Sequence, residues 1–341
     1  MKLEKKAPEF IAEISANHLG SLDRAKELVH AAAKAGANYV KFQTYTAHTM
    51  TLNLDKFKVG TDHELWGGRN LYELYEEAHT PWEWHPELFE LARSLGVTPF
   101  SSPFDLTAIE FLEDLNVELY KIASLETGDH QLIRRVAETG KRLIISTGAT
   151  ELSEIADLVE VVRQTGNTKL TLLVCTSSYP ASPKEAHLKR IETIRNEFDV
   201  EVGLSDHTLG IGVSLAAITL GASIIEKHLT LRRSDGGADS AFSMEPNEFA
   251  QLIVEGKSAF DSLGDSTWRM QPSEQESRSL RRSLYITQNV KAGELVTREN
   301  VRSIRPNGGC PPKHLGEMLG KRFKFDQVEG TPMSLEYISD N

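Results

Sequence analysis

Two lysines stand inside short apolar runs of the sequence, where an unpaired charge is costly to bury. Lys41 lies in Val40-Lys41-Phe42 and Lys121 lies in Tyr120-Lys121-Ile122. A single such lysine could point away from any site or pair with a glutamate. Serines stand at or just after the ends of such runs, at Ser102, Ser124 and Ser146. Because ammonium and hydroxyl groups together suit phosphate oxygens, the pattern predicts a phosphate site.

Two histidines end two later apolar runs. His207 closes Leu204-Ser205-Asp206-His207, and His228 closes Ile225-Glu226-Lys227-His228. Neutral imidazoles suit Mn, Fe, Co or Zn, so a metal site is one interpretation, with Asp206, Glu226 or Glu13 adding oxygen ligands or orienting the rings. The other interpretation is a pair of hydrogen-bonded histidines in a polar cavity. Cys175 could also bind a metal, but a small buried residue is the expectation.

Helical and strand patterns alternate along the chain and would position these residues. Amphipathic runs ending at Gly or Asn, such as 22–35 before Gly36, precede short β-rich runs, beginning with an opening strand over 10–14. Eight such strands predict an α/β fold, a closed (β/α)8 barrel of the TIM type. An open doubly wound sheet is less favoured because no Gly-x-Gly-x-x-Gly follows the first strand. In a barrel the carboxyl ends of the strands converge, which brings the polar residues together.

Domain boundaries follow from composition. We expect a barrel over residues 1–270, a polar linker over 271–283 and a small β-rich domain over 284–341. A domain this small has a marginal core and is expected to dock on something. The long connection 44–81 contains a helix predicted over 71–77 and is expected to act as a lid or partner contact.

Charge and composition restrict the classes of function. The formal net charge of −11 argues against nucleic acid as a partner, so the lysines must gather locally for an anionic substrate. The first residues contain no apolar signal region, and no apolar run is long enough to span a membrane, so the cytoplasm is the expected location. Two cysteines are too few for a disulfide framework.

The motifs taken together resemble the sialic acid synthase family, which condenses phosphoenolpyruvate with N-acetylated amino sugars. The resemblance covers nearly the whole chain, and the motifs include 13–18 (EISANH), 100–105 (FSSPFD), 175–180 (CTSSYP) and 203–208 (GLSDHT). The C-terminal residues resemble the family's antifreeze-like (SAF) domain, with 305–309 (RPNGG). Ser15 stands where N-acetylneuraminate synthases have Gly, and Ser177 where they have Asn. These features favour the branch that makes pseudaminic acid over those that make N-acetylneuraminic or legionaminic acid.

The resemblance implies roles for individual residues. Phosphoenolpyruvate would be bound by Lys41, Ser102, Lys121, Ser124, Ser146 and Ser205. His207 and His228 would hold Mn²⁺, or a similar ion such as Mg²⁺ or Co²⁺. Glu13 and Glu126 would be catalytic together with Lys121, and Glu13 could instead be a metal ligand. The sugar would contact Gln43, Ser177, Tyr179 and Asp239. Arg305 would reach the active site of a partner chain, which predicts a homodimer with exchanged C-terminal domains.

Two other classes of function remain open from the residues alone. A non-catalytic sugar- or ice-binding protein would not require lysines and histidines to converge, and it would release no phosphate. A class I aldolase would use Lys121 to form a Schiff base that borohydride traps. The hydroxyl groups around both lysines favour phosphate binding over a dry amine of lowered pKa.

Overall fold

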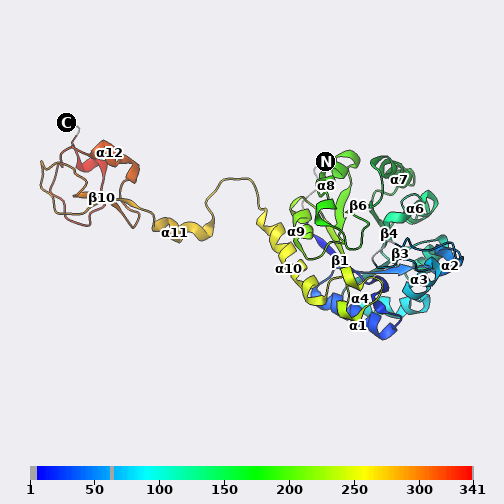
Figure 1. Ribbon diagram of the computed structural model, residues 1–341. Coiled ribbons are helices and arrows are strands. Elements are labelled where there is room, and N and C mark those ends of the chain that lie inside the picture. Colours follow the sequence, from blue (N-terminus) through cyan, green and yellow to red (C-terminus); the bar gives the residue numbers. More distant parts are fainter. Residues whose placement is uncertain (1–5, 62–64, 340–341) are drawn as a thin grey trace. The chain divides into compact units, whose positions relative to one another are not determined.

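The computed structural model describes residues 6–61 and 65–339, and within them eight parallel strands close into a barrel (Figure 1). The strands are β1 (Glu9–Glu13), β2 (Tyr39–Thr44), β3 (Thr98–Pro103), β4 (Leu119–Ile122), β5 (Arg142–Ser146), β6 (Leu170–Cys175), β7 (Glu201–Ser205) and β8 (Ile224–His228). Strand β8 pairs with β1 in a register that sets Glu13 opposite His228. The predicted (β/α)8 barrel is therefore confirmed.

Helices cover the outside of the barrel. They are α1 (Leu22–Ala35), α4 (His85–Ser94), α5 (Leu106–Asp114), α6 (His130–Ala137), α7 (Leu152–Gln164), α8 (Arg190–Phe198), α9 (Gly212–Thr219) and α10 (Pro246–Ser262). Helix α1 shows how the sequence sets the boundaries: the Ser21 side chain accepts from the Arg24 amide at one end, and Gly36 takes a φ of 92° at the other. Serine caps and left-handed glycines are favoured at these positions. The apolar faces of the helices pack on the outer faces of the strands.

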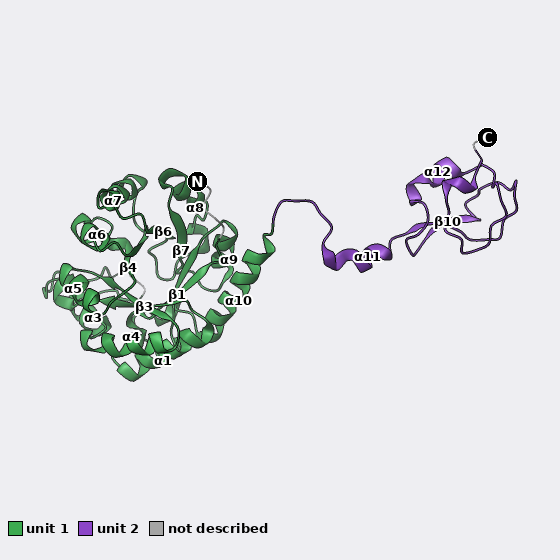
Figure 2. Ribbon diagram, turned by 180° about the vertical axis from the view of Figure 1, so that it is seen from behind, with its two compact units in different colours: residues 1–264 green, residues 265–341 purple. Residues whose placement is uncertain are grey.

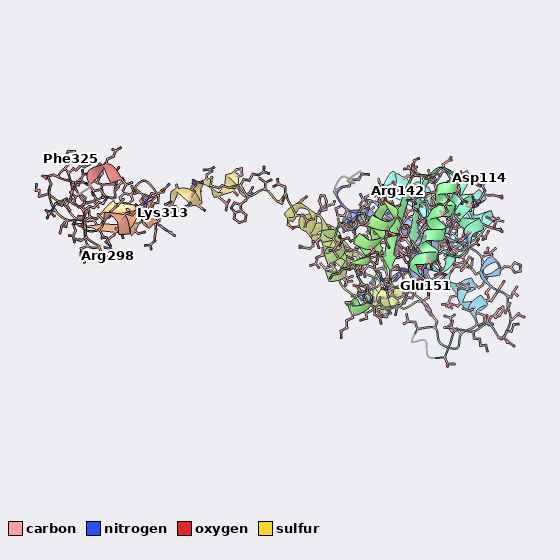
Figure 3. The ribbon with its side chains drawn as sticks, turned by 90° about the horizontal axis from the view of Figure 1, so that it is seen from above. Asp114, Arg142, Glu151, Arg298, Lys313 and Phe325 are labelled. Carbon is pink, nitrogen blue, oxygen red and sulfur yellow. The ribbon has the colours of Figure 1, made fainter. Side chains whose placement is uncertain are left out.

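The interior of the barrel has an apolar half and a polar half. Six buried apolar side chains form a plug between the strands: Ile11, Phe100, Leu119, Ile144, Leu173 and Ile224. At the amino ends of the strands, Arg142 pairs with Glu9 at 2.7 Å and Glu201 at 3.1 Å. Figure 3 shows Arg142 and Glu151 at opposite ends of the barrel. The polar residues predicted to do chemistry lie beyond the plug, at the carboxyl ends.

The connection between β2 and α4 is a long insertion, of which residues 45–61 and 65–81 are described. It contains α2 (Ala47–Met50) and α3 (Leu71–Ala78), which confirms the predicted short helix. Its two ends are tied to each other, since Trp82 Nε1 donates to the Tyr45 carbonyl at 3.1 Å and His85 Nε2 lies 2.9 Å from Thr44 Oγ1. Buried imidazoles with such partners act as structural residues, and burial lowers the pKa of His85 to about 4.

The chain divides into two compact units, residues 1–264 and 265–341 (Figure 2). The second unit has a core of its own, formed by Leu284, Ile286, Val290, Val296, Val301, Met318, Phe323, Met333 and Ile338. Strands β9 (Ser283–Ile286) and β10 (Val301–Ile304) pair antiparallel, and α12 (Leu315–Met318) follows. Part of the predicted linker is helical, as α11 (Gln275–Ser279). Among the described residues, no helix has the length and apolar character needed to span a membrane.

Candidate active site

A cavity of about 410 Å³ opens at the carboxyl ends of the barrel strands. Its base contains most of the residues singled out from the sequence, namely Lys41, Gln43, Lys121, Ser124, Glu126, Ser146, Ser177, Tyr179, Ser205, His207, His228 and Asp239. The insertion supplies an apolar wall from Met50, Val59, Trp66, Leu71, Leu74, Tyr75 and Ala78. The cavity is thus polar where the strands end and apolar along the insertion.

Both lysines converge on one buried carboxylate. Glu226 Oε1 lies 2.9 Å from Lys41 Nζ and 3.4 Å from Lys121 Nζ, and it accepts from Ser205 Oγ at 3.2 Å. Burial disfavours the charge on Glu226, but Lys121 and Lys41 outweigh it and hold its pKa at about 2. Lys41 also lies 2.7 Å from Glu13 Oε2. The two ammonium groups are therefore fixed side by side, as an anion site requires.

Unpaired hydroxyl groups surround the lysines. Among the described residues, the buried Oγ atoms of Ser102 and Ser146 have no hydrogen-bond partner. Ser124 Oγ accepts from the Gly148 amide at 3.0 Å and keeps its own proton for another acceptor. Buried polar groups are normally satisfied, so unpaired hydroxyls beside two ammonium groups point to an anionic ligand.

Glu126 faces the same cavity from the turn after β4. Burial is the largest influence on it and raises its pKa to about 7, although the charge of Lys121 opposes this. Its Oε2 atom is buried without a hydrogen-bond partner among the described residues. A carboxyl group that titrates near neutrality beside an anion site has the properties of a catalytic acid or base.

The two histidines meet at the ends of β7 and β8. Their ring centroids are 5.4 Å apart. His207 Nδ1 is 3.0 Å from the Thr176 carbonyl, so it carries the proton and leaves Nε2 as a lone-pair donor. His228 Nδ1 is buried with no hydrogen-bond partner among the described residues and lies 4.0 Å from Asp239 Oδ2. The buried Cys175 Sγ lies 3.9 Å from His207 Nδ1.

This donor set fits a divalent ion that keeps open positions. No cluster of three or more His, Cys, Asp or Glu side chains with metal-binding geometry occurs within residues 6–61 and 65–339. Two nearby imidazoles, one oriented by a backbone carbonyl and one with an unsatisfied buried nitrogen, nevertheless suit a catalytic ion completed by water or substrate.

A polar chain joins the strand β1 and β2 ends to the loop after β8. Gln43 Nε2 donates to Glu13 Oε1 at 3.2 Å and to Ser15 Oγ at 3.0 Å. Ser15 Oγ in turn donates to Asp239 Oδ2. Next to this chain, Trp66 Nε1 donates to the Ala238 carbonyl at 3.1 Å, and its ring lies 5.9 Å from that of Tyr179.

Three residues from the sequence prediction lie elsewhere. Glu13 and Ser102 are fully buried at the strand ends but do not line the cavity. Glu13 acts on the cavity through Lys41 and Gln43. Arg305 belongs to the second unit, residues 265–341, and not to the barrel unit.

Several cavity residues were not singled out from the sequence as site residues. They are Ser15, Ala16, Tyr45, Trp66, Tyr75 and Phe242, together with the apolar side chains of the insertion. Glu226 was expected only as an oxygen ligand or as a residue that orients the histidine rings, whereas the structure pairs it with Lys41 and Lys121. Trp66 and Tyr75 lie in the connection expected to act as a lid, but no pattern indicated which of its side chains would face the cavity.

The fold and the cavity define a TIM-barrel protein with an anion site and a histidine pair at the carboxyl ends of its strands. The NeuB family model matches residues 28–267 and the SAF domain model matches residues 281–335. The chain belongs to the NeuB family. The family and the C-terminal SAF domain expected from the motifs are thereby confirmed.

Individual relatives are similar over nearly the full length. The pseudaminic acid synthase of Helicobacter pylori is 43% identical over 97% of this chain and 98% of its own. The N,N'-diacetyllegionaminic acid synthase of Legionella pneumophila is 36% identical over 96% of this chain and 94% of its own. A solved structure of N-acetylneuraminic acid synthetase from Leptospira borgpetersenii, in complex with citrate, matches with a TM-score of 0.72 at 32% identity, covering 80% of this chain and 90% of that one.

Proposed function

We propose that the protein is a pseudaminic acid synthase. It condenses phosphoenolpyruvate with 2,4-diacetamido-2,4,6-trideoxy-L-altrose and releases phosphate. The observation that carries the proposal is the coincidence of this cavity with 43% identity to a pseudaminic acid synthase over 97% of the chain. Synthases of legionaminic acid are more distant, at 36% identity.

The phosphate and carboxylate of phosphoenolpyruvate bind at the lysine end of the cavity. Lys41 and Lys121 provide the charge, and the hydroxyl groups of Ser124, Ser146 and Ser205 provide further donors. Ser102 completes this set from behind the cavity wall, where its buried Oγ has no partner among the described residues. Because Glu226 already neutralises part of the lysine charge, the site keeps its ammonium groups ordered before the ligand arrives.

The aldehyde of the open-chain sugar lies at the histidine end. His207 and His228 would hold Mn²⁺ or a similar divalent ion, which supplies Lewis acidity toward the aldehyde oxygen when bound. Gln43, Ser177, Tyr179 and Asp239 line the cavity beside these histidines and position the sugar. The apolar wall of the insertion accommodates the methyl groups of a deoxygenated, acetylated sugar.

Bond formation joins C3 of phosphoenolpyruvate to the aldehyde carbon and leaves positive charge at C2. The carboxylate of Glu126 stabilises that charge, and Glu13 supports it through Lys41. Water then adds at C2, one of its protons passes to the former aldehyde oxygen, and the other leaves with phosphate as the C2–O bond breaks and a carbonyl group forms. Glu126 takes the proton from the attacking water, since its pKa of about 7 suits a general base near neutrality.

Arg305 is proposed to complete the site from another copy of the chain. The second unit has a small core of its own, and such small domains gain stability by docking. We therefore propose a homodimer with exchanged C-terminal units. We also propose the cytoplasm as the location, because phosphoenolpyruvate is formed there.

Phosphate release tests the function. The protein is incubated with phosphoenolpyruvate, Mn²⁺ and one acceptor at a time: the altrose derivative, the acceptor of legionaminic acid synthases, or N-acetylmannosamine. Release with the altrose derivative alone, with a product of the matching mass, supports the proposal. Release with another sugar alone would reassign the acceptor, and a chelator that leaves the rate unchanged would argue against the metal. A Lys121→Met variant controls for contaminating activity.

A further inference from the structure

Ser15 adopts a backbone conformation that its side chain disfavours. Its φ is 46°, in the left-handed region, and the residue is 4% exposed at the wall of the cavity. Glycine takes this conformation without steric cost, whereas a residue with a Cβ does not. Strained residues of this kind cluster at functional sites when the side chain is needed there. The hydroxyl group of Ser15 is therefore the feature to explain.

That hydroxyl sits between two side chains and fixes both. The two oxygens of Glu13 can only accept, so the nitrogen of the Gln43 amide must face Glu13 and Ser15. Both amide protons of Gln43 are then used within the protein, and its carbonyl Oε1 is left for a ligand. Ser15 Oγ accepts from Gln43 and gives its own proton to Asp239 Oδ2, which also accepts from the Ala16 amide at 3.4 Å.

The loop that carries Asp239 is held by other contacts. Asn17 Nδ2 donates to the Leu229 carbonyl at 3.0 Å and to Ser243 Oγ at 2.9 Å. Ser243 Oγ donates to the Asp239 carbonyl at 2.6 Å. The backbone at Asp239 is thus anchored without Ser15, and the Ser15 hydroxyl controls only the orientation of the carboxylate. Asp239 Oδ1 is left for a ligand in the cavity that the residue lines.

We propose that Ser15 is a positioning residue for the acceptor sugar. Its hydroxyl aligns the Gln43 carbonyl and the Asp239 carboxylate as a pair of acceptors for the N–H and O–H groups of an acetamido sugar. This inference rests on the proposed function and names the residue that sets its sugar end. The Ser15 hydroxyl bonds to Gln43 and Asp239 rather than to Lys41 or Lys121, so we expect the binding of phosphoenolpyruvate to be nearly insensitive to Ser15.

Two variants separate the hydroxyl from the backbone strain. Ser15→Gly removes both, and Ser15→Ala removes the hydroxyl alone. We expect both variants to raise the KM for the sugar about tenfold, because each loses a hydrogen bond to a charged group. The KM for phosphoenolpyruvate should stay within about twofold of the wild-type value. Ser15→Gly should have a Tm at or above that of Ser15→Ala, because glycine relieves the strain. Because Ser15 is proposed to act by orienting Asp239, Asp239→Asn should raise the KM for the sugar less in the Ser15→Gly protein than in the wild-type protein.

Ser101→Ala is the matched control. Ser101 is fully buried, and its hydroxyl lies 2.6 Å from Thr44 Oγ1, but it does not line the cavity. It should lower the Tm and leave both KM values unchanged. An unchanged sugar KM in Ser15→Gly would overturn the inference, and so would an equal rise in both KM values. Calorimetry measures the Kd for the sugar in the same variants without any turnover. Absence of phosphate release would therefore count against the proposed function alone. If the wild-type protein binds no acetamido sugar, both proposals are wrong.

Discussion

Lys227 Nζ lies 3.1 Å from Asp206 Oδ2, and both side chains are 1% exposed. The pair is satisfied on every side, because Lys227 also donates to the carbonyls of Thr208 and Gly210, and Asp206 accepts from Ser214 Oγ. Each member is next in sequence to a histidine of the cavity, His207 or His228, and neither lines the cavity itself. The ends of β7 and β8 are therefore joined behind the histidines by a buried ion pair.

Breaking this pair should be costly. Lys227→Met leaves Asp206 as an unpaired buried charge, which costs about 3–5 kcal/mol. Denaturant unfolding of the variant measures the loss. The control is Lys26→Met, because the ion pair of Lys26 with Glu87 is partly exposed at 29% and 57% and should contribute about 1 kcal/mol or less. Equal effects of the two substitutions would contradict this account of the pair.

The rate should depend on pH through two groups near neutrality. Burial raises the pKa of Glu126 to about 7, so its carboxylate forms as the pH rises through that value. Burial lowers the pKa of Lys41 to about 7, against the influence of Glu226, so its positive charge is lost over the same interval. Because the reaction needs an ionised Glu126 and a charged Lys41, kcat/KM for phosphoenolpyruvate should pass through a narrow maximum near pH 7.

Glu126→Gln identifies the rising side of this profile. The variant should lose most of its activity, and the activity that remains should no longer increase from pH 6 to 7. Steady-state rates of phosphate release across the pH series provide the measurement. A rising side that persists unchanged in Glu126→Gln would assign that titration to a different group.

Loss of a lysine charge should weaken phosphoenolpyruvate binding selectively. Lys41→Met removes a charge-assisted donor worth about 1.5–3 kcal/mol, which corresponds to a rise in KM of about one to two decades. The KM for the sugar should change much less, because Asp239 contacts Ser15 and Ala16 rather than Lys41. Lys26→Met again serves as the surface control. A larger effect on the sugar than on phosphoenolpyruvate would show that the two ends have been assigned the wrong way round.

Exchange of C-terminal units predicts complementation between inactive variants. Arg305→Ala and Lys121→Met damage different units of the chain. If Arg305 acts in a partner chain, unfolding and refolding an equimolar mixture should restore about a quarter of the wild-type sites, through heterodimers with one intact site each. Each variant refolded alone is the control. Restoration of no activity by the mixture would place Arg305 in its own chain's site or outside it.

The sequence predicted the barrel well because its signals are local. Most helix-to-strand repeats carry their own apolar period and a terminal Gly or Asn, as at Gly36, and eight strands alternating with helices leave few alternative folds. Convergence of Lys41, Lys121, His207 and His228 on one cavity then followed from the rule that parallel strands end on one side.

The sequence pattern does not predict which side chains contact one another. That Glu226 is shared by Lys41 and Lys121 depends on the register between strands far apart in the chain. The positive φ of Ser15 could not be foreseen, since serine rarely adopts it. The inward direction of Trp66 and Tyr75 follows from the path of a long insertion without a repeating period, and the role proposed for Arg305 would depend on another copy of the chain.

The division of the cavity between strand ends and insertion has an evolutionary consequence. The groups proposed to handle phosphoenolpyruvate are built into the strands, where most substitutions would disturb the barrel itself. The apolar wall comes from one insertion, whose two ends are held together by the contacts of Thr44 with His85 and of Tyr45 with Trp82. Mutations can accumulate in that insertion without altering the residues at the strand ends, so descendants of this scaffold can acquire new acceptor sugars while keeping the same chemistry.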